Sequence, residues 1–145
     1  MTKLSSAEIG YIAGLFDGEG SLHIRRGLEK KKKHKGEGHR ISNSMRISME
    51  ISMTDEYVIR WVHEILAVGT VIRRDIKGKT KSGGKFKTQW RWRCTFRDCY
   101  YVCKLIWADA KVKLHKIEQV IDHYEPEYFK SDNVVSLHQY RQEIK

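Results

Sequence analysis

The chain has 145 residues, a length that fits a single domain, residues 1–145, with an apolar core of its own. Its 28 Lys and Arg residues outnumber its 18 Asp and Glu residues, and the formal net charge is +10. A strongly basic chain attracts polyanions, so nucleic acid is the expected partner. No segment shows the amphipathic basic helix of a membrane-surface protein or the long apolar run of a membrane span.

The first residues, MTKLSSAE, lack the apolar core of a secretion signal. We therefore expect an intracellular protein of the cytoplasm or of an organelle, with no membrane partner and no small-molecule substrate. The three cysteines Cys94, Cys99 and Cys103 are odd in number and contain no CxxC pair, which argues against a disulfide framework and against a zinc finger. Cys99 and Cys103 have helical spacing and are expected to be buried on one helix face.

A first helix is expected over residues 6–17. Ser5 and Glu8 have the spacing of a capping box, and apolar residues follow them with a helical period. Residues 21–26 then alternate between apolar and polar side chains, as a strand does. Residues 27–39 contain three glycines and a run of lysines, a composition that predicts a basic loop.

The most regular alternation runs over residues 44–53, with Met and Ile on one face and Ser, Arg and Glu on the other. This pattern predicts a long strand with one face in water. Residues 55–66 return to helical spacing, residues 69–76 are expected to form a third strand, and residues 77–85 form a Gly and Lys loop. Residues 86–97 alternate again and predict the fourth strand.

The rest of the chain is expected to be helical, over residues 98–107, over residues 111–123, and in a last helix from about Asp132. Pro126, the only proline, separates the last two helices. The predicted order is αββαββα, an αββ unit written twice, followed by an extra C-terminal helix. Four alternating strands with helices segregated to one side predict an α+β domain whose four-stranded antiparallel sheet exposes a polar, basic surface.

Three glycines, Gly10, Gly14 and Gly18, recur at four-residue spacing in the first helix, with Ala13 between them. Two glycines inside a helix cost roughly 2 kcal/mol relative to alanine. That loss has a reason if another backbone must approach this face closely. The pattern therefore predicts a helix that contacts a second helix.

Two acids, Asp17 and Glu19, stand at the C-terminal end of the same helix, where the macrodipole disfavours carboxylates. A divalent cation is one explanation, because carboxylate and carbonyl oxygens form a site suited to Mg²⁺. Two such helices packed by their bare faces would bring two acidic ends together. The alternative is a glycine-rich helix end followed by a turn, with two solvated acids. The spacing alone favours neither interpretation.

The order of residues in this segment resembles the LAGLIDADG motif of homing endonucleases. Residues 12–20 read IAGLFDGEG, and the main change of character is Gly18 in place of an alanine. Residues 66–69, LAVG, and residues 111–113, KVK, are similar to other recurrent features of that family. The resemblance covers about residues 9–116 and implies the homing-endonuclease-like αββαββα fold. Because the motif occurs once, it also implies a homodimer.

The resemblance implies a role for each matching residue. The eighth motif position, Glu19, would be catalytic and a metal ligand, with the Gly18 carbonyl as second ligand and Mg²⁺, or Mn²⁺ in its place, as cofactor. The sixth position, Asp17, would be a structural cap. Lys113 would be the catalytic lysine, with Lys111 as the alternative. The motif helices would meet in the dimer through Gly10, Ala13, Gly14 and Asp17.

The implied activity is that of a sequence-specific endonuclease of the intron or intein type, which cuts both strands of a long pseudo-palindromic DNA site by metal-dependent phosphodiester hydrolysis. Many family members carry a polar residue near the end of the second strand, where this chain has Met53, or Ser52 in a different register, and this is a departure from the pattern. An RNA-binding intron maturase or a non-cleaving DNA-binding regulator on the same fold is the alternative function, and a basic RNA-binding module without catalysis is a third.

The polar faces of the four expected strands supply the candidate DNA contacts, since a two-stranded ribbon fits the major groove. By alternation the groove-facing set is His23, Arg25, Ser44, Arg46, Ser48, Glu50, Arg74, Lys87, Gln89, Arg91 and Arg93. The alternative is an ordinary solvated sheet face. Trp90 and Trp92 alternate with the arginines and are expected in the core together with Phe86 and Phe96.

Overall fold

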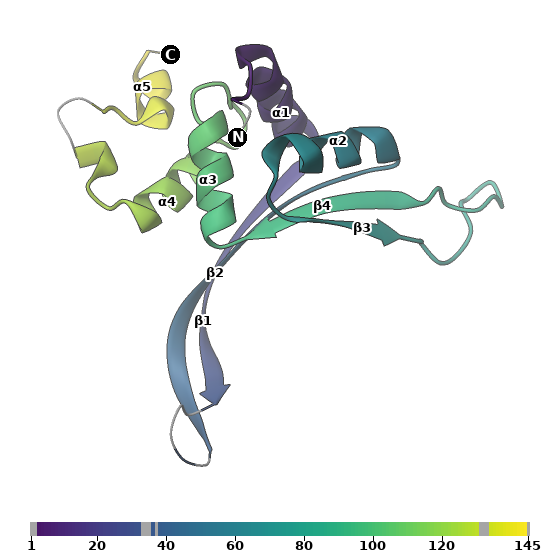
Figure 1. Cartoon of the computed structure of the whole chain (residues 1–145), viewed down its shortest axis with the longest axis horizontal. Helices are drawn as coiled ribbons and strands as arrows, with labels where there is room; N and C mark the ends of the chain where they lie inside the picture. Colours follow the sequence, from purple (N-terminus) through teal and green to yellow (C-terminus); the bar gives the residue numbers. More distant parts are fainter. Residues whose placement is uncertain (1–2, 33–35, 37, 131–133, 145) are drawn as a thin grey trace.

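The structure is a computed structural model that describes residues 3–32, 36, 38–130 and 134–144. Its strands form one antiparallel sheet in the order β1-β2-β4-β3, and the helices lie on one side of that sheet (Figure 1). The expected α+β class and the αββαββα order, with further helices at the C-terminal end, are confirmed. No helix of the described ranges is both long and apolar enough to cross a membrane.

The first αββ unit consists of α1 (Ser6–Glu19), β1 (Gly20–Lys32) and β2 (His39–Met53). The expected capping box starts α1, because the Ser5 hydroxyl accepts from the Glu8 N–H at 3.1 Å and the Glu8 carboxylate accepts from the Ser5 N–H at 2.9 Å. The loop expected over residues 27–39 is wrong in extent. The lysine run carries no strand pattern, yet β1 and β2 stay paired as far as Lys32 and His39.

The second unit consists of α2 (Glu56–Leu66), β3 (Thr70–Arg74), β4 (Gln89–Thr95) and α3 (Arg97–Ile106). Both strands are shorter than the alternation predicted. Residues 86–88 are not part of the β4 strand. Thr88 and Asp75 follow the last β3–β4 pair, Arg74 and Gln89, and are joined by their side chains, since the Thr88 hydroxyl donates to the Asp75 carboxylate at 2.8 Å.

The C-terminal region consists of α4 (Leu114–Tyr124), the 3-10 helix η1 (Tyr128–Lys130) and α5 (Leu137–Glu143). Helix α4 was expected to begin at residue 111 but begins at Leu114. The backbone N–H groups of Lys111 and Lys113 are instead hydrogen-bonded to the Asp17 carboxylate on α1. Pro126 follows α4, as expected. The last helix begins at Leu137, whereas its expected start, Asp132, lies outside the described residues.

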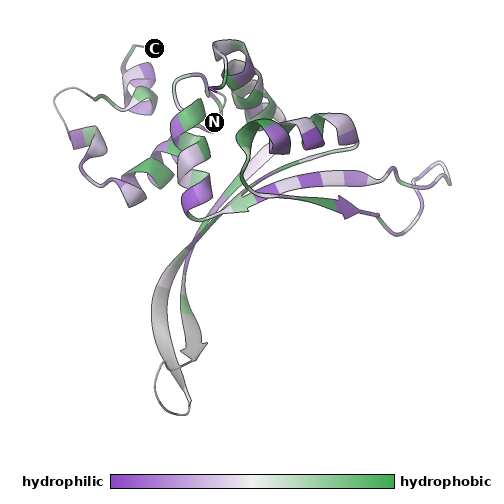
Figure 2. Cartoon of the chain, viewed as in Figure 1, coloured by the Kyte–Doolittle hydropathy of each residue, from purple (hydrophilic) through white to green (hydrophobic). Residues whose placement is uncertain are grey.

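The core lies between the sheet and the helices. Figure 2 shows apolar residues alternating with polar ones along α1 and α3. Met49 and Trp92 are fully buried from the sheet side, and Trp90 is half-buried against them, as expected. Cys99 and Cys103 are buried on one face of α3, also as expected. Phe86 and Phe96, by contrast, are 43% and 51% exposed, because both lie beyond the ends of β4.

Two of the segments that resemble family motifs each contain a glycine at a position that leaves no room for a side chain. A Cβ at Gly20 would lie 2.1 Å from the Phe16 ring, so the step from α1 into β1 leaves no room for a side chain. Gly69 has φ +86, and a Cβ there would lie 2.5 Å from the Arg93 carbonyl oxygen. The chain turns out of α2 through Ala67, which is left-handed with φ 56, and the Trp92 indole then donates to the Val68 carbonyl at 2.9 Å.

The first two strands extend well beyond the rest of the sheet. Strand β2 pairs with β4 only from Ser48 to Met53, whereas β1 and β2 pair along their whole length. Residues 24–32 and 39–47 therefore form a two-stranded ribbon, here called the arm, which projects away from the helices (Figure 1).

Candidate active site and nucleic-acid interface

Asp17 joins the end of α1 to the segment that precedes α4. Its carboxylate accepts from the backbone N–H of Lys111 at 2.7 Å and from that of Lys113 at 3.1 Å. Both oxygens are therefore engaged within the chain, 94 and 96 residues away in sequence. This geometry is that of a structural cap, and it leaves Asp17 poorly placed as a metal ligand.

The Lys113 side chain makes a second contact with Asp17. Its ammonium donates to the Asp17 carbonyl at 2.6 Å and lies 5.7 Å from the centre of the Phe16 ring. The last carbonyls of a helix lack intrahelical partners and carry partial negative charge, and α1 has no basic residue in its own last turn. Lys113 supplies that positive charge from another element. Lys111, the alternative, is exposed and meets Asp17 through its backbone.

Glu19 is the last residue of α1, and both Glu19 and Gly18 are exposed. Because Asp17 is engaged elsewhere, Glu19 is the carboxylate at this end of α1 that is open to a ligand. No cluster of three or more His, Cys, Asp or Glu side chains able to hold a metal occurs among the described residues. One carboxylate and a nearby carbonyl still fit Mg²⁺, which in proteins commonly takes one or two carboxylates together with substrate phosphates.

One face of α1 is left open by the rest of the chain. A Cβ built at Gly10, Gly14 or Gly18 would meet nothing within 4 Å. The expectation that Ala13 shares this face is wrong, because Ala13 is fully buried. It lies one residue out of phase with the glycines and points with Ile12 into the core. The open face is instead continued by the exposed residues Ala7 and Tyr11.

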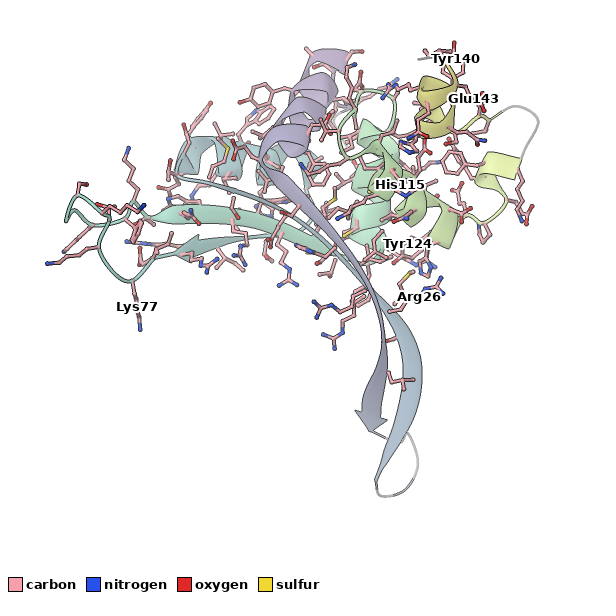
Figure 3. All side chains as sticks on the ribbon, turned by 180° about the vertical axis from the view of Figure 1, so that it is seen from behind. Arg26, Lys77, His115, Tyr124, Tyr140 and Glu143 are labelled. Atoms are coloured by element: carbon pink, nitrogen blue, oxygen red, sulfur yellow. The ribbon has the colours of Figure 1, made fainter. Side chains whose placement is uncertain are left out.

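The polar face of the sheet brings together the expected strand residues. The register pairs His23 with Ser48, Arg25 with Arg46, Glu50 with Arg93, and Arg74 with Gln89, and it places Ser44 and Arg91 on the same side. Nitrogen-tipped side chains extend from the sheet on the side away from the helices (Figure 3). Arg73 has the opposite parity and lies 5.9 Å from the centre of the Trp90 ring, so Arg74 is the groove-facing member of that pair.

One expected member of this set lies elsewhere. Lys87 is exposed but precedes β4, so the prediction that it stands on the strand is wrong. The same register adds polar-face residues that the groove-facing set did not include, namely Thr70 and Ile72 on β3 and Thr95 on β4. Their signal was present in the sequence as parity with Arg74 and Arg93. The set is also internally paired, since the Arg91 Nε lies 3.6 Å from a Glu50 carboxylate oxygen.

Ser52 and Met53, at the end of β2, face opposite sides of the sheet. Met53 pairs with Trp90 and packs against the core, whereas Ser52 pairs with Arg91 on the polar face. Of these two candidates for the family's polar position, only Ser52 faces the side on which DNA is expected.

Solved structures of homing endonucleases superpose on most of this chain. The match to the homing endonuclease I-CvuI, in complex with a DNA target in the presence of Mg, has a TM-score of 0.56 at 14% identity, covering 82% of this chain and 66% of that one. The match to the homing endonuclease I-TnaI has a TM-score of 0.53 at 16% identity, covering 88% and 78%. The match to the LAGLIDADG homing endonuclease I-LtrWI bound to target DNA has a TM-score of 0.54 at 15% identity, covering 91% and 42%.

The chain has the LAGLIDADG homing endonuclease fold. It spans less than two thirds of the I-CvuI chain and less than half of the I-LtrWI chain. No protein-family model and no curated protein matches the sequence. The fold assignment therefore rests on the structural similarity and on the short motif at the end of α1.

Proposed function

We propose that the chain is a metal-dependent endonuclease that cuts both strands of duplex DNA as a homodimer. The observation that carries this proposal is the hydrogen bond from the Lys113 ammonium to the Asp17 carbonyl. It holds a cation at the turn of α1 that also presents Glu19, beside the open glycine face and the basic sheet. An acid, a cation and a polyanion-binding surface therefore meet at one end of one helix.

The open face of α1 supports the dimer. Gly10, Gly14 and Gly18 offer a bare stripe on which the α1 helix of a second copy can lie, and this crossing would bring two Glu19 residues close together. Each copy would then lay its sheet and arm in the major groove of one half-site, since the groove admits a two-stranded ribbon. Two copies related by a two-fold axis match a long pseudo-palindromic target of the intron or intein type.

The Glu19 carboxylate and the Gly18 carbonyl would hold the metal, with phosphate oxygens of the DNA completing its ligands. When bound, Mg²⁺, or Mn²⁺ in its place, would make the attacking water more acidic and would neutralise charge on the phosphate. Lys113 presents a fixed positive charge at the same point and stabilises the charge that develops on the phosphoryl oxygens. Arginines of the sheet face, such as Arg93, pair with base edges, while lysines contact phosphates.

The deciding experiment is incubation of the chain with Mg²⁺ and a randomised duplex library, followed by recovery of molecules cut on both strands. Glu19→Gln should abolish cutting and retain binding, whereas Glu64→Gln, at an exposed glutamate on α2, should leave both unchanged. Lys113→Ala should slow cutting about 10²-fold, the scale for losing one positioned charge. Cutting by Glu19→Gln at the rate of the unaltered chain would contradict the proposal.

The alternative, an RNA-binding maturase, gives a different outcome in the same assay. Such a chain cuts no duplex with Mg²⁺ or Mn²⁺ and binds structured RNA more tightly than DNA. A regulator that binds DNA without cutting retains a selected duplex site in a binding assay but leaves it intact.

A further inference from the structure

A basic cleft opens beside the candidate active site. It has a volume of about 400 Å³ and lies between residues 20–23 at the start of β1 and residues 112–116 at the start of α4. Gly20, which follows Glu19 directly, forms one end of it. None of the described residues that line it is acidic. This cleft adjoins the surface of the sheet that the proposed function uses for base contacts and shares His23 with it.

Four basic side chains line the cleft, from Lys113, Lys116, His23 and His115. Each of the two ammonium groups is held by one backbone carbonyl, since Lys113 donates to the Asp17 carbonyl at 2.6 Å and Lys116 donates to the Leu22 carbonyl at 3.2 Å. An ammonium has three donors, so each lysine retains donors for a ligand after this bond is made.

The imidazole of His115 is also fixed. Its ring lies 4.7 Å from that of His138 on α5, and its Nε2 lies 3.1 Å from the Gln119 side-chain nitrogen. Figure 3 shows His115 close to the C-terminal helix, on which Tyr140 and Glu143 are labelled. Anchored lysines and an anchored imidazole form a site that needs little reordering when an anion enters.

The cleft lies where a bound duplex would leave the sheet. Strand β1 is an edge strand, and His23 belongs both to its polar face and to the cleft. A duplex seated on the polar face, with a phosphate at Glu19, continues past this edge. On the basis of the proposed function, we propose that the cleft binds a backbone phosphate of the DNA strand next to the scissile phosphate, with Lys116 and His115 as its contacts.

Phosphate contacts are independent of base sequence and make binding depend on salt. Binding of a mixed-sequence duplex in EDTA should therefore show a log Kd against log [salt] slope that Lys116→Gln reduces by about 1 per half-site. Lys116→Arg keeps the charge and the donor to Leu22 and should retain the slope. Lys104→Gln is the matched control, because the Lys104 ammonium pairs with Glu125 at 3.5 Å and lies over the Tyr128 ring, and it should leave the slope unchanged.

A second variant avoids the bond that Lys116 makes to β1. His115→Glu places an anion in the cleft and should weaken duplex binding at least tenfold, whereas Gln139→Glu adds the same charge at an exposed position on α5 and should change it less than twofold. An unchanged slope for Lys116→Gln, or equal losses for the two glutamate variants, overturns the cleft while leaving the endonuclease proposal standing. A chain that binds no duplex at any salt concentration overturns both.

Discussion

Asp17 and Lys113 bind each other twice: the Asp17 carboxylate accepts from the Lys113 backbone N–H at 3.1 Å, and the Lys113 ammonium donates to the Asp17 carbonyl at 2.6 Å. This reciprocal contact fixes the segment before α4 against the end of α1. It also gives Asp17 and Glu19, which lie two residues apart, different surroundings. Asp17 holds the segment before α4 in place, and the exposed Glu19 stays open to a ligand.

Asp17→Ala should lower the free energy of unfolding by about 1–3 kcal/mol, because the N–H groups of Lys111 and Lys113 lose their acceptor. Urea denaturation followed by circular dichroism measures the change. Glu19→Gln, at an exposed position, should change it by less than about 0.5 kcal/mol. Equal effects of the two substitutions would refute this division of roles.

Gly14→Leu should convert the proposed dimer to a monomer without destabilising the subunit, because a side chain at Gly14 meets nothing in its own chain. Sedimentation equilibrium gives the mass, and thermal unfolding at low concentration gives the stability. Ala13→Leu is the informative counterpart, since Ala13 is fully buried and the added methylenes should cost about 1–3 kcal/mol within the subunit. Persistence of the dimer in Gly14→Leu would exclude the α1 crossing.

Glu118→Ala should release the C-terminal helix. This carboxylate is only 7% exposed and accepts from the Trp107 indole and the His138 N–H, each at 3.1 Å, and from the Ser136 hydroxyl. Its removal leaves these donors without their acceptor, at a cost of at least about 2 kcal/mol. We expect proteolysis near residues 134–144 to become faster while the rest of the domain stays resistant. Gln139→Ala, at an exposed position on the same helix, should leave the proteolysis rate unchanged.

The buried thiols should make the chain less stable in alkali. The hydrogen bond with Cys99 and then burial raise the pKa of Cys94, and burial raises the pKa of Cys103. Thiols of the unfolded chain ionise at about pH 8.5, whereas these stay protonated in the folded chain, so the unfolding free energy falls as the pH rises above that value. Unfolding by urea at pH 7 and at pH 10 measures the loss, and Cys103→Ala should reduce it. A Cys103→Ala chain with the same loss would show that other groups cause it.

The elements with local signals could be predicted from the sequence. The capping box at Ser5 and the alternation over residues 44–53 correctly indicated α1 and the face of β2, because caps and side-chain parity depend on near neighbours. Ala13 was misplaced because its small size suggested the glycine face, although its helical phase points into the core. The extension of β1 through the lysine run was missed because interstrand hydrogen bonds need no apolar alternation.

The geometry of the candidate active site was harder to predict than its candidate residues. The motif over residues 12–20 pointed to Glu19, and the KVK segment pointed to Lys113. The double contact between Lys113 and Asp17 spans 96 residues, and no local pattern encodes it. Likewise, Lys116 reaches the Leu22 carbonyl only because α4 is folded against the edge of β1.

The arm stands apart from the core that stabilises the domain. Among its described side chains, Ile47 is buried in the core and Ile24 and Met45 pack against it, whereas Leu28, further out, is 76% exposed. A substitution at Leu28 should therefore have little effect on folding. If the proposed function holds, the arm is therefore the segment to exchange or randomise when a different DNA target is wanted.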